Sequence, residues 1–451
     1  MQERFSASAL LPALGLLGLA VGLGAVFRLI GRWQKLETSV PEFIALALAA
    51  GAMYLAGVYL VEQFRLGRAA LLIILLGAVV FRLFVLLREP ALSADVYRYQ
   101  WEGRIQRLPV NPYTVSPATP GLKGFQDPAH PLATGRNVST LYPPLSEWAF
   151  TWARTIPGYK RLFTGLDLAA IAVLLALLAA LKQPLHRVLT YAWNPTIVLS
   201  FALCGHHDSL ALLTLLGASL LIIHRKPRLS VAFLALSTIS KFFSVLVLPV
   251  FLRRTRRVYA AIFVAVVALG YVPYLGAGRR LFRGLADYAI GWEGNDSLFR
   301  LIRLAGNSKA QAELVAAVLT LALVAYATRK GWEPLRACLF LLAALLFLSP
   351  NAFPWYFTWI IPFLCFYPSA PLLLASVSCV LGYAPVVAYA AGQPYRDSPF
   401  ILALEYVPVY LWLAVEGWRG VRNSKIETRN SKREMGSLFS PSPPASSSVW
   451  C

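Results

Sequence analysis

A carboxylate, Asp95, follows an apolar run at 69–87 that is long enough to cross a bilayer. Aromatic and basic residues surround it in the segment 95–104, DVYRYQWEGR. Charged groups at the mouth of a membrane span are costly, so they are candidates for function. A helix here would place Asp95, Tyr99 and Glu102 on one face, with Arg98 beside them. An arginine keeps a carboxylate ionised, as a general base that activates a hydroxyl must be. The alternative is an interfacial helix with a solvated charge pair.

A second polar group lies in the turn 205–208, GHHD, between two apolar runs. His206, His207 and Asp208 could bind a metal ion, or the histidines could hold a phosphate when protonated. The alternative is a polar turn in which Asp208 caps the next helix. Adjacent histidines point apart on regular structure, which weakens the metal reading.

Aromatic residues mark two further segments, 291–296 (GWEGND) and 351–359 (NAFPWYFTW). Aromatics at a membrane boundary usually act as anchors, but the first segment also has the polar groups of a binding loop. Lys241 stands inside an apolar stretch. An intramembrane lysine snorkels, pairs, or lines a wet cavity.

The elements that must position these residues are membrane helices. Of 451 residues, 58% are hydrophobic and only 14% are charged, well below the roughly 25% charged residues of soluble domains. The apolar runs are continuous, which excludes an alternating β-barrel and predicts an all-α, polytopic transmembrane bundle. We expect about twelve spans: 7–29, 42–64, 69–87, 163–181, 185–203, 208–224, 256–275, 309–327, 335–350, 354–368, 371–391 and 401–417.

The segment 229–252 is predicted to form a re-entrant hairpin that turns near Lys241, because a single crossing would put its basic end on the wrong side. Both termini are then cytoplasmic. The enlarged loop 88–162, the segment 276–308 and the turn 205–208 lie outside. Several arginines of 276–308 also fall outside, against the usual charge rule.

The composition excludes several classes of protein. The net charge of +21 comes from short clusters between apolar runs, which indicates loops facing anionic lipid rather than nucleic acid. The five cysteines have no zinc-binding spacing, and no nucleotide-binding loop is present. We expect one membrane domain, 1–418, and a basic, Ser/Pro-rich disordered cytoplasmic tail, 419–451.

Taken in order, these motifs resemble one family. They are DVYRYQWEGRIQ from 95, NPY from 111, YPPLS from 142, GHHDSL from 205, SKF from 240 and PWY from 354. This order is similar to that of the bacterial polyprenyl-phosphate-dependent mannosyltransferases of the C-type (GT-C) glycosyltransferase superfamily. The resemblance covers about 80–370.

The resemblance implies a helix bundle in the bacterial inner membrane whose active site faces the periplasm or exterior. It implies hexosyl transfer, with mannose favoured, from a polyprenyl-phosphate donor to a glycan, glycolipid or protein hydroxyl, with inversion. Asp95 maps to the catalytic acid. Many relatives have paired acids, and here Ala94 precedes Asp95, so Glu102 is the candidate second acid.

Other residues receive roles in this scheme. The candidate cations for the donor phosphate are Arg98, Arg104, Arg136, His206 and His207. The candidates for sugar or acceptor contacts are Tyr99, Tyr142, Asp208, Trp292, Asn295, Trp355 and Tyr356. No metal ligand is assigned, and since superfamily members differ in their use of a divalent cation, that point stays open. The competing readings are a transporter or flippase of lipid-linked sugars and a non-catalytic membrane scaffold.

Overall fold

The computed structural model describes residues 7–33, 36, 39–126 and 135–438, and side chains from 11 to 418 within those ranges. The regular elements of these residues are all helices, and the only β contact among them is an isolated bridge between Gly294 and Asn351. The final part of the expected tail, 439–451, lies outside the described residues, while 419–438 continue the last helix. The prediction of an all-α fold is confirmed.

Eight helical segments of the described chain are long and apolar enough to span a membrane. Each coincides with an apolar run of the sequence, because a helix needs about 20 apolar residues to cross the hydrocarbon core. Six are single helices: α1 (Ala7–Ile30), α2 (Val40–Gln63), α3 (Arg68–Leu86), α6 (Ile156–Ala180), α15 (Lys309–Lys330) and α20 (Pro399–Leu438). Two are segmented: η6 (Arg257–Tyr259) with α12 (Ala260–Tyr271), η7 (Val272–Phe282) and α13 (Arg283–Gly291), and α18 (Ala370–Ser378) with η9 (Cys379–Tyr383) and α19 (Val386–Ala390).

The expected count of twelve spans is therefore corrected to eight. The other four runs, 185–203, 208–224, 335–350 and 354–368, form shorter or interrupted helices. Prolines begin several of these pieces, because proline lacks the N–H that a helix interior needs. The pieces are η3 (Leu185–Val188), α7 (Leu189–Ala192), α8 (Pro195–Val198), η4 (Leu199–Leu203), α9 (Asp208–Ile223), α16 (Pro334–Leu348), η8 (Pro354–Trp359) and α17 (Ile361–Leu364).

The segment 229–252 breaks at the predicted place. It comprises α10 (Pro227–Thr238), η5 (Phe242–Val247) and α11 (Leu248–Arg254), and Lys241 lies in the break. The break packs on the start of α5 (Pro144–Trp152), since Leu145 N donates to Ile239 O at 2.8 Å and Ser146 Oγ donates to Ser240 O at 2.7 Å. Nothing in the described residues marks this segment as a re-entrant hairpin.

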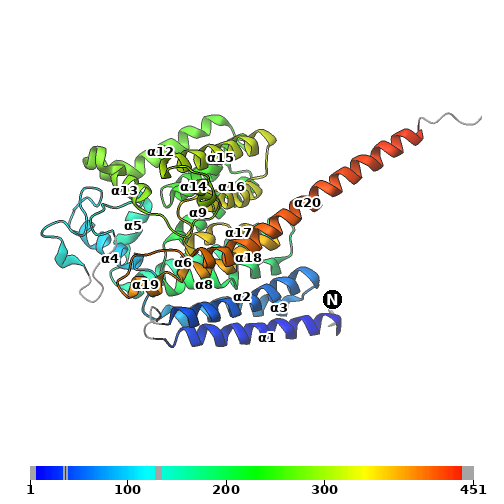
Figure 1. The fold of residues 1–451 in the computed structure, drawn as a ribbon, viewed down its shortest axis with the longest axis horizontal. Coiled ribbons are helices and arrows are strands. Elements are labelled where there is room, and N and C mark those ends of the chain that lie inside the picture. The colour runs from blue at the N-terminus through cyan, green and yellow to red at the C-terminus, as the bar shows by residue number, and fades with distance from the viewer. Residues whose placement is uncertain (1–6, 34–35, 37–38, 127–134, 439–451) are drawn as a thin grey trace, which may run out of the picture.

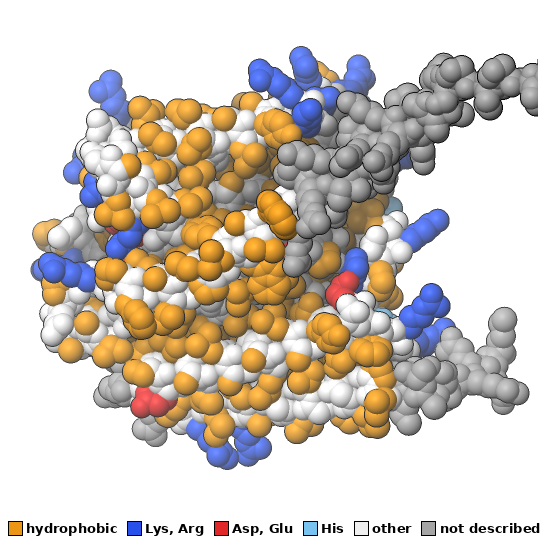
Figure 2. Space-filling view, turned by 45° about the vertical axis from the view of Figure 1, so that its right-hand side comes forward, with side chains coloured by type: hydrophobic (Ala, Val, Ile, Leu, Met, Phe, Trp, Pro, Cys, Tyr) orange, Lys and Arg blue, Asp and Glu red, His pale blue; other side chains and the backbone are white. Residues whose placement is uncertain are grey.

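The long helices run along one axis of the molecule (Figure 1). The helices α4 (Asp95–Gln106), α5 and α13 lie at one end, on the left of the view, and we call this the α4 end. The start of α1 and the far part of α20 lie toward the opposite end. Figure 2 shows a face dominated by hydrophobic side chains, with lysines and arginines mostly near its edges. Two short elements complete the fold: η2 (Lys123–Phe125) and α14 (Leu298–Leu304).

A buried ion pair fastens the central helices. Arg82 of α3 binds Asp167 of α6 through two contacts, of which Nη2 to Oδ1 is 3.1 Å, and both side chains are at most 1% exposed. Tyr191 Oη donates to the same carboxylate at 2.7 Å. Arg82 Nη1 also donates to the carbonyl oxygen of Ala192 at 2.9 Å. Both charges of this ion pair have partners within the protein, so the pair joins α3 to α6 and needs no ligand to account for it.

Candidate active site

Asp95 is the first residue of α4, at the α4 end of the bundle. Its side chain is 40% exposed, and its Oδ2 lies 3.6 Å from Nδ1 of the buried His206. The carboxyl is thus open to a small molecule while protein surrounds its other sides. The surrounding protein removes water from the carboxyl group and so raises the pKa of Asp95 to about 6, while the positive charge of nearby Lys241 opposes the shift. At neutral pH Asp95 is mainly ionised, as a general base must be.

The histidine turn lies directly against Asp95. Gly205 adopts φ +75°, and an added Cβ would approach Lys160 Cγ to 3.0 Å, so the turn needs glycine. Burial lowers the pKa of His206 to about 3, which keeps the ring neutral at pH 7. Neither ring nitrogen of His206 has a hydrogen-bond partner among the described residues. The neutral ring can donate one hydrogen bond to a ligand but cannot supply the cationic charge expected from the sequence.

His207 belongs to the packing behind the turn. It is fully buried, and its Nδ1 lies 3.1 Å from the hydroxyl of Tyr99. The rings of Tyr99, Tyr142 and Phe150 approach it edge-on, with centroids 5.0–5.5 Å away. These aromatic residues hold the histidine turn in place, so Tyr99 and Tyr142 act as its support rather than as an open sugar-binding wall.

Asp208 and Lys241 form a buried ion pair next to the turn. Lys241 Nζ lies 2.8 Å from Asp208 Oδ1, and the same oxygen accepts a 2.7 Å hydrogen bond from Trp359 Nε1. The lysine lies over the rings of Tyr356 and Trp359, 5.0 and 5.7 Å from their centroids. Asp208 Oδ2 has no hydrogen-bond partner in the described part of the chain.

Lys241 and Trp359 were not assigned to the site from sequence. The signal for Lys241 was present, because an intramembrane lysine needs a partner. Its partner could not be identified without knowing that the break in α10–η5 lies beside the histidine turn. Both Lys241 and Asp208 are close enough to Asp95 to influence its pKa.

An aromatic wall closes the site opposite α4. Trp355 stacks on His206 with centroids 4.3 Å apart and an 18° angle, and Phe353 stacks on Trp355 at 4.9 Å. Tyr356 stacks on Trp359 at 4.6 Å. The short helix η8, which Pro354 begins, supplies Trp355, Tyr356 and Trp359 of this wall. Trp355 therefore contacts His206, the neighbour of Asp95, and Tyr356 contacts Lys241.

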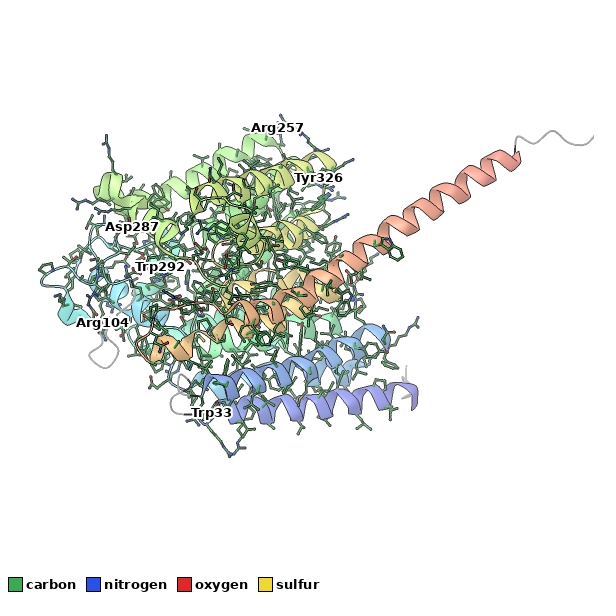
Figure 3. All side chains as sticks on the ribbon, viewed as in Figure 1. Trp33, Arg104, Arg257, Asp287, Trp292 and Tyr326 are labelled. Carbon is green, nitrogen blue, oxygen red and sulfur yellow. The ribbon has the colours of Figure 1, made fainter. Side chains whose placement is uncertain are left out.

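The loop around Trp292 reaches the site through Tyr288. Tyr288 Oη lies 3.0 Å from Tyr356 Oη, and the Tyr288 ring stacks on Trp292 at 5.4 Å. Figure 3 shows Trp292 at the same end of the bundle as Arg104 and Asp287. Trp292 thus supports the wall from behind.

Asn295 is buried and hydrogen-bonded within the protein, so it is not open to a ligand. Its Nδ2 donates to Ala352 O at 2.7 Å and to Glu405 Oε1 at 3.0 Å, and its backbone N donates to Asp397 Oδ2 at 2.7 Å. Its φ of +53° is one that asparagine tolerates better than most residues. These contacts fix the loop that leads into Trp355.

Arg98 and Arg104 of α4 donate to the part of the outer loop that follows this helix, Glu102 pairs with Arg98, and Arg136 lies in that loop. Arg98 donates to Glu102 Oε1 at 2.7 Å, to Gly135 O at 3.0 Å and to Val138 O at 2.8 Å. Glu102 is fully buried with a pKa raised by burial. Arg98 and Glu102 therefore hold the loop to α4.

The other two arginines also contact the loop. Arg104 Nη1 donates to Phe125 O at 3.0 Å, while Arg136 is exposed and its backbone oxygen accepts from Ala118 N at 2.8 Å. In the part of the chain that the structure describes, no group of three or more His, Cys, Asp or Glu residues is arranged to hold a metal ion.

The fold and this cluster define a multi-span membrane protein with a carboxylate, histidine and lysine site at one end of its helices. Residues 294–416 match the family model described as MptB C-terminal domain. The match contains Asn295, Trp355 and Tyr356, whereas Asp95 and Lys241 lie before it. No curated protein and no solved structure matches the chain.

Proposed function

We propose that this protein is a polyprenyl-phosphate-mannose-dependent mannosyltransferase that uses Asp95 as its general base. The MptB-type domain suggests this donor and a glycan acceptor, in agreement with the motif order of the whole chain. The observation that carries the proposal is the gathering of Asp95, His206, Lys241 and Trp355 from four separate parts of the chain. Transfer of a single sugar needs these groups: a base, a cation for the leaving phosphate and an aromatic surface.

Asp95 removes the proton from the acceptor hydroxyl as that oxygen attacks the anomeric carbon. Attack from the face opposite the phosphate inverts this carbon, and the bond to the phosphate oxygen breaks. Asp95 suits this role because it is the exposed carboxylate of the cluster, at 40%, whereas Asp208 is fully buried. General bases placed in this way contribute about 10²–10⁴ in rate.

Lys241 stabilises the charge that develops on the leaving phosphate. Its side chain is 17% exposed, and its ammonium group retains unused hydrogen-bond capacity beyond its contact with Asp208. The neutral His206 adds a hydrogen bond, and the partly exposed edges of Trp355 and Tyr356 contact the sugar. Arg98, Arg104 and Glu102 have no part in this scheme, because their contacts are with the outer loop and α4.

The orientation proposed for the bundle places the α4 end outside the bacterial inner membrane. The basic groups at and just beyond the ends of α11 and α15, Arg253–Arg257 and Arg329–Lys330 in the sequence, then face the cytoplasm, as the positive-inside rule favours. In this orientation α10, η5 and α11 enter from the cytoplasm and return, with the Lys241 break at the depth of the site. The helix α9 packs along α10 and α16 packs on η5, so protein covers part of this segment.

The test is transfer of radiolabelled mannose from polyprenyl-phosphate-mannose to endogenous acceptor glycolipids by the purified chain in liposomes. Asp95→Asn is expected to lose at least about a hundredfold in rate. Glu89→Gln, an exposed carboxylate six residues earlier, is the matched control and should transfer normally. Full activity in Asp95→Asn would overturn the assignment of the base. Movement of the donor across the bilayer without any transfer would instead support a flippase.

A further inference from the structure

Three arginines stand at the α4 end, which the proposed orientation places outside the inner membrane, where arginine-rich loops are unusual. Arg279 and Arg280 belong to η7, and Arg283 begins α13. All three are exposed, and Arg283 is 71% exposed. The helical stretch from Arg257 to Asp287 runs along the bundle, so these arginines lie far from the basic loops that follow α11 (Figure 3). Positive-inside bias does not account for them.

Large apolar side chains lie among these arginines and are also exposed. Leu275 is 60% exposed, Phe282 is 53% exposed and Ile290 is 75% exposed. A segment that presents both large apolar groups and cations is typical of a membrane interface, where the first enter the acyl region and the second remain among the headgroups.

The charge of this face is nearly uncompensated. Arg283 has only a loose contact with Asp287, at 3.9 Å. Among the described residues no carboxylate pairs with Arg279 or Arg280. Since guanidinium groups bind phosphate through paired hydrogen bonds, the face is complementary to phosphate rather than to another cation.

The opposite side of the same segment contacts the site. Gly284 packs so closely on the outer loop that an added Cβ would lie 2.3 Å from Thr140 O. Tyr288 meets Tyr356 of the aromatic wall. Lys309 Nζ fixes the end of α13 by donating to Ile290 O at 2.7 Å and to Ala289 O at 3.0 Å. The segment 275–290 therefore contacts the site on one side and exposes its arginines and large apolar side chains on the other.

We propose that this arginine face binds the headgroup phosphates of anionic phospholipids in the leaflet at the α4 end. The face consists of Leu275, Arg279, Arg280, Phe282, Arg283 and Ile290. The apolar members insert among acyl chains, and the arginines take the phosphates at the headgroup level. Bound lipid then holds α13, and with it Tyr288, against the site. This binding is independent of whether the site transfers mannose.

The experiment measures lipid enrichment beside α13 in the full chain. Ala286, an exposed residue of α13, is replaced by cysteine and labelled with a fluorophore, in a Cys451→Ser background because the four described cysteines are buried. The protein is placed in nanodiscs of phosphatidylcholine with a fixed fraction of phosphatidylglycerol. Bromine quenchers are carried on the acyl chains of one lipid or of the other.

Brominated phosphatidylglycerol is expected to quench more strongly than brominated phosphatidylcholine at the same mole fraction. The triple variant Arg279→Gln/Arg280→Gln/Arg283→Gln should weaken the relative binding constant by on the order of a hundredfold, which makes the two lipids equivalent. The corresponding triple lysine variant should retain the preference in reduced form, because it keeps the charge.

A second triple variant, Arg256→Gln/Arg257→Gln/Arg329→Gln, is the matched control at the opposite end and should leave the quenching unchanged. Equal loss in this control would overturn the proposal, since it would show a general charge effect. So would displacement of phosphatidylglycerol by stoichiometric polyprenyl phosphate, because the face would then serve the donor. Equal quenching by both lipids in the unaltered chain would also refute it.

Discussion

Replacement of Lys241 by methionine is expected to destabilise the protein strongly. The variant leaves Asp208 fully buried with Trp359 Nε1 as its one remaining donor among the described contacts. An uncompensated buried charge of this kind costs about 3–5 kcal/mol. Asp208→Asn should cost less, about 1–3 kcal/mol, because Lys241 is 17% exposed and still lies over Tyr356 and Trp359.

The double variant Lys241→Met/Asp208→Asn separates pairing from packing. It has no buried charge and keeps an amide oxygen for Trp359, so its stability should fall within about 1 kcal/mol of the unaltered chain. The coupling between the two positions is then about 3 kcal/mol or more. Transfer of mannose should remain low in this variant, because the cation for the leaving phosphate is absent.

The assay is thermal unfolding in detergent, followed by reaction of the four buried cysteines with a thiol-reactive dye. Lys241→Met should lower the midpoint by on the order of 5 °C or more, and the double variant should recover most of that loss. Lys330→Met, an exposed lysine at the end of α15, is the control and should not move it. The reasoning fails if Lys241→Met melts like the unaltered chain, or if the double variant melts as low as Lys241→Met.

Four further outcomes are expected. At pH values below about 6 the rate of mannose transfer should decrease, because Asp95, whose pKa is raised, becomes protonated there. The same decrease in the residual activity of Asp95→Asn would contradict this. Arg98→Gln should cost about 2–4 kcal/mol by leaving buried Glu102 unpaired, with little change in the KM for donor, and a large KM increase would restore Arg98 to the site. Gly103→Ala should cost about 2–3 kcal/mol because its Cβ would lie 2.0 Å from Phe150 O, whereas Gly165→Ala, with open space around it, should be neutral or stabilising in the same unfolding assay. Trp355→Leu should raise the KM for the sugar donor about tenfold or more, because it removes the aromatic side chain that contacts the sugar and supports His206, and an unchanged KM would exclude the proposed sugar contact.

The sequence predicts the long helices well, because an uninterrupted apolar run has only one way to satisfy its backbone in lipid. It overcounts the spans where proline interrupts a run, as at Pro195, Pro354 and Pro362. Hydropathy records how apolar these residues are and carries no measure of how deeply they lie. Buried protein interior and lipid-facing helix have the same composition in such a chain.

For the site, residue types and their positions identified Asp95, His206 and Trp355, but not the contacts that hold these residues in place. These three residues lie close together, as their positions at the ends of apolar runs suggest. Arg98 was expected to bind phosphate, yet backbone carbonyls of the outer loop take its donors. An arginine that holds a loop and one that holds a ligand look the same in sequence. Lys241 was not assigned to the site from sequence, because its partner Asp208 is revealed only by the three-dimensional position of the break between α10 and η5.

The contacts of Asp208 also impose an order on biosynthesis. Trp359, which donates to its carboxylate, follows it by 151 residues, and Lys241 arrives between the two. While the chain is still being made, α9 begins with a charge that has no partner, and such a group is costly in hydrocarbon. The N-terminal end of α9 therefore reaches its final depth only after the Lys241 break is in place. The ion pair of Asp208 with Lys241 therefore forms only after α10 has been synthesised.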